Sequence, residues 1–235
     1  GKASYNGLVL SAQRRVAHGL TFTGNYTWSH CISDPWVQST NSGLGGTGWT
    51  SSNDRHFDRG NCTVAATDRR HVFNLTAALD MPKFSNTALR TVASGWHFSP
   101  IFRMLSGGFY SVTTSTDVAL SAITGQRVNQ VLGDPYGNKT PGKFLNAAAF
   151  ALPAPGTSGN MGSASIAGPG TWQFDVGLSR SFQLREAKKL EFRAEAFNLT
   201  NSFHMDDRFL TTNFNSNTFG QVTAAKDPRI MQFAL

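Results

Sequence analysis

The segment LTFTGNYTWS, residues 20–29, decides the fold class that this sequence predicts. Apolar and polar residues alternate along it, and a glycine takes one of the apolar positions. Successive side chains of a β-strand point to opposite faces, so the segment predicts a strand with one apolar and one polar face. Its length is also about what a tilted strand needs to cross a bilayer. The apolar face holds Leu20, Phe22, Gly24, Tyr26 and Trp28, and the polar face holds Thr21, Thr23, Asn25, Thr27 and Ser29.

The same alternation recurs in SYNGLVLSAQRR (4–15), HVFNLTAALD (71–80), GWHFSPIFRML (95–105), TWQFDVGLSRSF (171–182) and KLEFRAEAFN (189–198). In the last segment a charged row lies opposite an apolar row, which suits either solvent and a protein core or a hydrated lumen and lipid. We expect lipid and a lumen. The expected lipid-facing residues are Leu20, Phe22, Tyr26, Phe174, Val176, Leu178, Leu190 and Phe192. The expected lumen-facing residues are Thr23, Asn25, Asp175, Glu191, Arg193 and Glu195.

Two further features favour lipid over a soluble sandwich. Aromatic residues lie near the expected strand ends, as in an interfacial girdle, at Tyr26, Trp28, Trp96 and Trp172. The connections alternate between short ones (15–19, 81–95, 183–188) and long ones (31–68, 113–170, 200–218), like periplasmic turns and surface loops. The Pro-, Gly- and Ala-rich stretch 147–170 is expected to be irregular rather than helical. The sequence therefore predicts an all-β fold, an antiparallel up-and-down transmembrane β-barrel segment with long surface loops.

Composition agrees with one apolar and one wet face. Charged residues make up 15% of the chain, below the roughly 25% of soluble domains, and hydrophobic residues make up 40%. The net charge of +7 is scattered, with no basic helix, so we expect no nucleic-acid partner. The chain begins at Gly1 without a signal peptide, so we expect the natural N-terminus to lie upstream.

Cys31 and Cys62 fall in one expected surface loop. Passage through the oxidising periplasm favours a disulfide between them over free thiols. The same loop holds Asp54, His56 and Asp58, whose side chains could bind zinc, but CxxC and HExxH spacings are absent. We therefore expect a polar loop there rather than a metal site.

Catalytic and cofactor motifs are also absent from the sequence. GDPYGNKT (133–140) lacks the Gly-Lys-Ser/Thr triplet of a phosphate-binding loop, and no GxSxG elbow occurs. We expect no cofactor and no enzymatic activity. Two alternatives stay open: a stand-alone extracellular β-protein, such as an adhesin, fibre subunit or carbohydrate binder, and a truncated reading frame with hydrolytic activity in loop 30–71.

Several segments resemble, in order, the barrel of Oar-like TonB-dependent transporters, which carry a carboxypeptidase regulatory domain. The stretch SYNGLVLSAQRRVAHGLTFTGNYTWSH (4–30) resembles a hairpin of that barrel. DRRHVFNLTAALDMP (68–82) and SGWHFSPIFRMLSGGFYSVTT (94–114) resemble its next two strands. The most specific match is residues 144–201, which begin FLNAAAFALPAPG, and FGQVTAAKDPRIMQFAL (219–235) resembles the closing strand.

The resemblance implies nutrient uptake across the bacterial outer membrane through a plugged barrel of roughly 22 strands. This chain contains neither plug nor TonB box, and residues 1–235 provide only about seven or eight of those strands. The implied partners are outer-membrane lipid and the remaining strands and plug of a parent chain, or neighbouring copies. TonB would be reached only through a missing N-terminal region.

Overall fold

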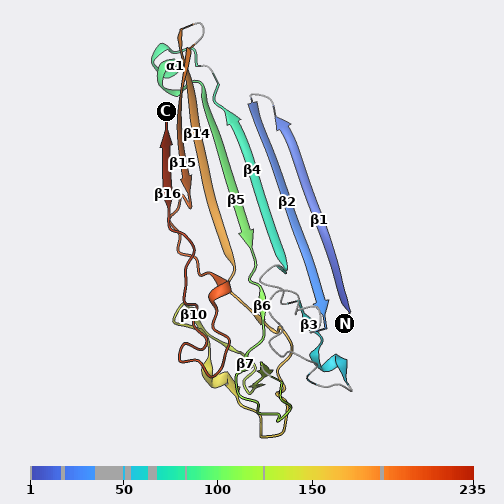
Figure 1. Cartoon of the computed structure of the whole chain (residues 1–235). Coiled ribbons are helices and arrows are strands. Elements are labelled where there is room, and N and C mark those ends of the chain that lie inside the picture. The colour runs from blue at the N-terminus through green and yellow to red at the C-terminus, as the bar shows by residue number, and fades with distance from the viewer. Residues whose placement is uncertain are drawn as a thin grey trace.

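The computed structural model describes residues 2–16, 19–34, 50, 54–62, 68–82, 84–123, 125–185 and 188–235. Seven of its strands form one antiparallel sheet, which we call the wall (Figure 1). They lie in the order β1 (Ala3–Val16), β2 (Leu20–Ser33), β4 (His71–Asp80), β5 (Trp96–Leu105), β14 (Thr171–Arg185), β15 (Lys188–Phe197) and β16 (Ile230–Ala234). The short β3 (Gly60–Asn61) pairs with β2. The predicted all-β antiparallel fold is confirmed, and within the described residues β1 and β16 are the open edges of the wall.

Strand pairing lines up the apolar positions of the wall. Tyr26 lies opposite Phe73, and Phe73 lies opposite Met104. Residues directly opposite one another share a face of an antiparallel sheet, so they form a row. That row continues to Trp172. The neighbouring row contains Ala12, Gly24, Leu75, Phe102 and Phe174.

The other face of the wall is polar. Asn25, Asn74 and Arg103 form a row that continues to Gln173, and the side-chain amide of Asn74 donates to Asn25 Oδ1 at 3.0 Å. A slip of one residue between strands would exchange the faces. The observed register instead keeps Phe22 and its apolar set on one face and Thr23 and its polar set on the other.

The connections β1–β2, β4–β5 and β14–β15 lie at one end of the wall, the turn end, and the long connections lie at the other, the loop end (Figure 1). This arrangement agrees with the predicted alternation. One short connection differs, because it contains helix α1 (Thr87–Ala93), where only a link was expected. Asn86 Oδ1 accepts from the Ala88 N–H at 3.0 Å, and Trp96 Nε1 donates to the Val92 carbonyl at 2.8 Å. A helix of seven residues is too short to show a helical period in sequence.

At the loop end, residues 106–170 and 198–229 fold together into what we call the loop-side module (Figure 1). Its strands form four small pairs: β6 (Phe109–Tyr110) with β13 (Ile166–Ala167), β7 (Thr113–Thr114) with β8 (Gln126–Arg127), β9 (Asn129–Gln130) with β12 (Phe150–Ala151), and β10 (Tyr136–Thr140) with β11 (Lys143–Leu145). Short 3₁₀ turns lie at η5 (Ala147–Ala149) and η6 (Asp207–Phe209), and η3 (Arg55–Asp58) lies in the first long connection. No helix of the described residues is long and apolar enough to span a bilayer.

A hydrophobic core holds the module together. It contains Val112, Val128, Phe144, Leu145, Ala149, Phe150, Met161, Ile166, Leu210 and Val222. Residues 147–170, all of which the structure describes, contain no α-helix, as predicted. They nevertheless contribute four residues to the core, and the expectation of an irregular loop did not include this packing. The wall is a single layer of strands and contributes none of these core residues, whereas the module encloses all of them.

Candidate functional site

The predicted disulfide between Cys31 and Cys62 is confirmed, with their α-carbons 5.4 Å apart. Cys31 lies in β2, and Cys62 directly follows β3. The Cys62 N–H also donates to the Cys31 carbonyl at 3.1 Å. The bridge therefore fastens the returning end of the first long connection to the wall.

The residues weighed as metal ligands have structural contacts instead. Asp54 caps η3 by accepting from the His56 N–H at 2.9 Å. Asp58 is 1% exposed and accepts from Arg127 Nη1 at 2.8 Å and from both the N–H and the hydroxyl of Thr50 at 2.6 Å. Among the described residues, no three His, Cys, Asp or Glu side chains are grouped to hold a metal ion.

Arg127 ties the first long connection to the module. Besides Asp58, its guanidinium donates to the carbonyls of Met161 and Phe57, each at 2.8 Å, and lies over the Phe57 ring. Arg127 itself is only 8% exposed. A buried charge is tolerated when it is paired and hydrogen-bonded, and each of the three nitrogens of this guanidinium donates to an acceptor.

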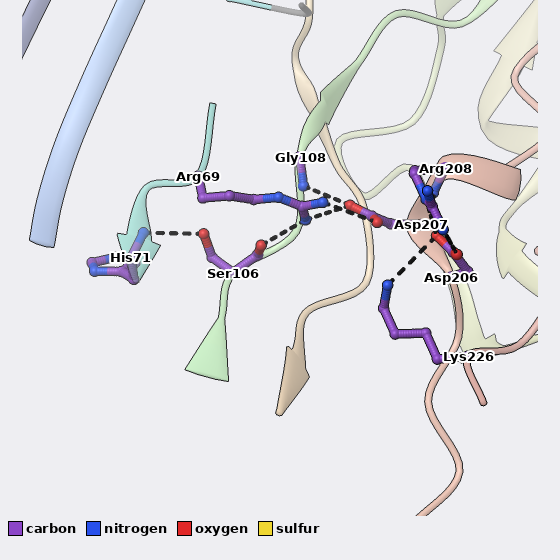
Figure 2. A network of polar contacts seen from close by, with 8 residues as sticks. All are labelled: Arg69, His71, Ser106, Gly108, Asp206, Asp207, Arg208 and Lys226. Atoms are coloured by element: carbon purple, nitrogen blue, oxygen red, sulfur yellow. Dashed lines mark hydrogen bonds and ion pairs between the residues drawn. The ribbon is translucent and has the colours of Figure 1, made fainter. Parts of the chain in front are cut away.

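A second buried pair joins Arg69, just before β4, to Asp207 in η6 (Figure 2). Arg69 donates to both carboxylate oxygens of Asp207, and its Nη1 also reaches the Ser106 carbonyl at 2.8 Å. The Gly108 N–H donates to Asp207 at 3.0 Å, and Ser106 Oγ accepts from the His71 N–H at 3.1 Å. This network fixes the module to the loop ends of β4 and β5.

Asp34, at the end of β2, is a third fully buried carboxylate, which accepts from the Lys2 N–H at 3.0 Å and from Arg59 Nη1 at 3.4 Å. The sequence interpretation missed all three aspartate–arginine pairs. Arg69 and Asp207 are 138 residues apart, and Asp58 and Arg127 are 69 apart. Apart from the charges themselves, no local pattern indicates which residues pair.

Next to the second pair, Asp206 faces Arg208 and Lys226 (Figure 2). Hydrogen bonds from Arg208 lower the pKa of Asp206 to about 2, and its closest Lys226 contact is 3.8 Å. Burial lowers the pKa of the nearby His204, and Lys226 lowers it further. Asp206 is therefore ionised and His204 neutral at neutral pH.

These residues line one side of a cavity of about 700 Å³ at the loop end. The wall supplies the other side, chiefly from its polar face. Within the described part of the chain, the exposed Arg103 guanidinium in this lining makes no hydrogen bond or ion pair. The charged lining residues are Arg103, Asp206, Arg208, Lys226 and Asp227.

The polar wall residues singled out in the sequence fall into two groups. Asp175 accepts from Gln173 Nε2 at 2.8 Å and from the Asn198 N–H at 2.8 Å, beside the cavity. Toward the turn end, Arg193 Nη2 lies 3.2 Å from Glu191 Oε1 in an exposed pair. Glu195 lies on the same face, opposite Gly177. The structure thus distributes these four residues along the wall and does not gather them into one site.

Comparison with known proteins agrees with this architecture. The model of a family described as an outer membrane beta barrel domain matches residues 1–232. Searches of curated proteins and of solved structures give no significant match. Because the family match covers nearly the whole chain, this chain belongs to the outer membrane beta barrel domain family and lies in the bacterial outer membrane.

Proposed function

We propose that this chain forms part of the wall and the extracellular loops of a TonB-dependent transporter for nutrient uptake. The observation that carries the proposal is the cavity between the polar face of the wall and the loop-side module, which has its own hydrophobic core. The cavity volume lies within the roughly 300–1,000 Å³ of small-molecule sites. The resemblance of the barrel segments to Oar-like transporters supports the TonB-dependent mechanism.

On this proposal, the apolar face of the wall contacts lipid, and Asp175, Glu191, Arg193 and Glu195 face a hydrated lumen. The register supports this assignment, since the four lie together on the polar face. Charged side chains on a lipid-facing strand surface are costly, whereas lumen-facing ones are solvated. The loop end then lies outside the cell, where the cavity meets incoming solutes.

We propose a non-catalytic role. Two of the acidic side chains described in loop 30–71 support this, because Asp34 and Asp58 each accept from an arginine and are buried. His30 is hydrogen-bonded to Asn61 at 3.0 Å. A nucleophile or a general base must be free to reach its substrate. The contacts just given occupy Asp34, Asp58 and His30 instead.

Solute depletion from the medium tests the proposal. The bacterium that carries this protein is compared with a strain lacking it, and the spent medium is analysed by mass spectrometry. We expect at least one nutrient to be consumed only when the protein is present, and its uptake to stop when a protonophore removes the protonmotive force. Equal depletion by both strains, or uptake that survives the protonophore, would contradict TonB-dependent transport.

A further inference from the structure

The wall side of the cavity contains a guanidinium to which no described residue is hydrogen-bonded or ion-paired. Arg103 lies on the polar face of β5, directly opposite Gln173 of β14, and it lines the cavity. The Gln173 side-chain amide donates instead to both carboxylate oxygens of Asp175, at 2.8 and 3.0 Å. Asp175 also accepts from the Asn198 N–H at 2.8 Å, so this wall carboxylate has donors of its own. A guanidinium presents a planar fork of N–H donors that matches a carboxylate.

The opposite side of the cavity adds positive charge. Asp206 is neutralised by Arg208, which donates to both of its carboxylate oxygens (Figure 2). Lys226 approaches Asp206 only to 3.8 Å, which is beyond hydrogen-bond distance. Apart from the Asp206–Arg208 pair, the charged residues of the lining are Arg103, Lys226 and the exposed Asp227. The lining therefore has one positive charge in excess.

Exposed apolar side chains complete the lining. Phe197 of β15 and Ile230 of β16 lie directly opposite one another on the polar face, at its loop end. They are 38% and 43% exposed, and Phe209 of the module, which also lines the cavity, is 49% exposed. On this face an exposed apolar side chain has no lipid to contact, and a group of them indicates a binding surface. The cavity thus offers cations and an apolar surface together.

We propose that the cavity binds small organic carboxylates, with the acid group on Arg103 and Lys226 and an apolar body against the three exposed apolar side chains. A carboxylate carries one negative charge, which equals the excess of positive charge in the lining. A phosphate monoester carries about −1.5 to −2 and would leave negative charge uncompensated. The volume of about 700 Å³ leaves room for a body beside the acid group. This inference rests on the proposed function, in that it takes the cavity as the site that incoming solutes meet.

Ligand binding to the protein purified in detergent from the outer membrane of its host tests the proposal. The probes are indolepropionate and phenylbutyrate, each compared with its own primary amide, which has the same body without the charge. Phenylpropyl phosphate is the comparison for the acid group. Calorimetric titration gives each Kd, after subtraction of a titration into protein-free detergent. We expect at least one carboxylate to bind roughly tenfold or more tightly than its amide, as a charge-assisted hydrogen bond implies.

Three variants separate the two parts of the site. Arg103→Gln should weaken carboxylate binding to the level of the amide. Phe197→Ala should weaken both ligands alike and preserve the preference for the carboxylate. Arg193→Gln is the matched control, since Arg193 lies on the same face but toward the turn end, outside the lining of the cavity. It should bind like the wild type, and the melting temperature of each variant shows that it is folded.

The proposal is overturned if the wild type shows no preference for either carboxylate over its amide, whether both bind or neither does. It is also overturned if the preference survives in Arg103→Gln or if the phosphate binds more tightly than phenylbutyrate. Solute depletion distinguishes this inference from the proposed function. Protonophore-sensitive uptake of nutrients that all lack a carboxylate would contradict the inference and leave the function intact. Arg103-dependent carboxylate binding without protonophore-sensitive uptake would contradict TonB-dependent transport and leave the binding site intact.

Discussion

At the residue scale, the contacts that hold the loop end are buried aspartate–arginine pairs. Asp207 is 1% exposed and accepts from Arg69 and from the Gly108 N–H. Asp207→Asn removes the charge but leaves the guanidinium buried, and breaking a buried pair in this way costs roughly 3–5 kcal/mol. We expect faster hydrogen exchange in residues 106–112 and a lower melting temperature. Asp134→Asn is the matched control, since Asp134 is exposed and asparagine still accepts from the Tyr136 N–H. Equal effects of both variants would refute the buried-pair argument.

Gly60 in β3 packs directly against the module. A methyl group at Gly60 would lie 2.0 Å from the Ser163 carbonyl oxygen, which is backbone and cannot rotate away. Overpacking of this kind costs about 1–3 kcal/mol. We expect Gly60→Ala to lower the melting temperature and to weaken protection around residues 161–166 in hydrogen exchange. Gly133→Ala is the control, because nothing lies within 4 Å of the added methyl there. A Gly60→Ala variant as stable as Gly133→Ala would refute the contact.

At the element scale, the wall was predictable from sequence and the module was not. Six of the seven wall strands carry a period-two pattern locally: the segment 71–80 coincides with β4, and 20–29 lies inside β2. The seventh, β16, was expected only from the resemblance of residues 219–235 to a closing strand. The last four residues of β2, which include Cys31, lack the alternation and were assigned to the loop. The module core draws on positions from Val112 to Val222 with no fixed spacing. Its pairings depend on contacts over long sequence separations, which no local window contains.

The Cys31–Cys62 bridge holds β3 against β2, and β3 in turn contacts the module, since Asn61 Nδ2 donates to the Ala164 carbonyl at 2.8 Å. Closing a loop of this length stabilises by about 3–4 kcal/mol in the chain-entropy account. In the double variant Cys31→Ser, Cys62→Ser we expect increased hydrogen exchange in β3 and in residues 161–166. The β4–β5 ladder should keep its protection, because its pairing does not pass through the bridge. Loss of protection throughout the wall would contradict this division.

Substitutions at two adjacent residues of β4 can test whether the apolar face of the wall contacts lipid. Leu75 lies in the middle apolar row, opposite Gly24 and Phe102, and Thr76 points to the other face. A lysine facing lipid near mid-bilayer costs about 2–4 kcal/mol, whereas a lumen position is hydrated. We expect Leu75→Lys to lower the yield of folded protein in the outer membrane and its denaturant midpoint, and Thr76→Lys to have a much smaller effect. The reverse order would exchange the assignment of the two faces.

At the scale of the whole molecule, the charged polar face argues against a small barrel made from this sheet alone. A closed barrel of about eight strands has an interior just wide enough for its own side chains. The wall would have to enclose Arg103, Asp175, Glu191, Arg193 and Glu195. Among these five residues the structure shows one ion pair, between Glu191 and Arg193.

We therefore expect residues 1–235, produced alone and refolded into detergent, to give no closed monomer. The measurements are the protein mass in the detergent complex by light scattering and the change in gel mobility on heating, which reports a closed barrel. The expected outcome is aggregated or unfolded chain without a heat-dependent mobility shift. A homogeneous particle with one 25.4 kDa chain and such a shift would show that the sheet closes by itself. It would do so through a parallel β1–β16 ladder, since strand direction permits no other closure of these seven strands.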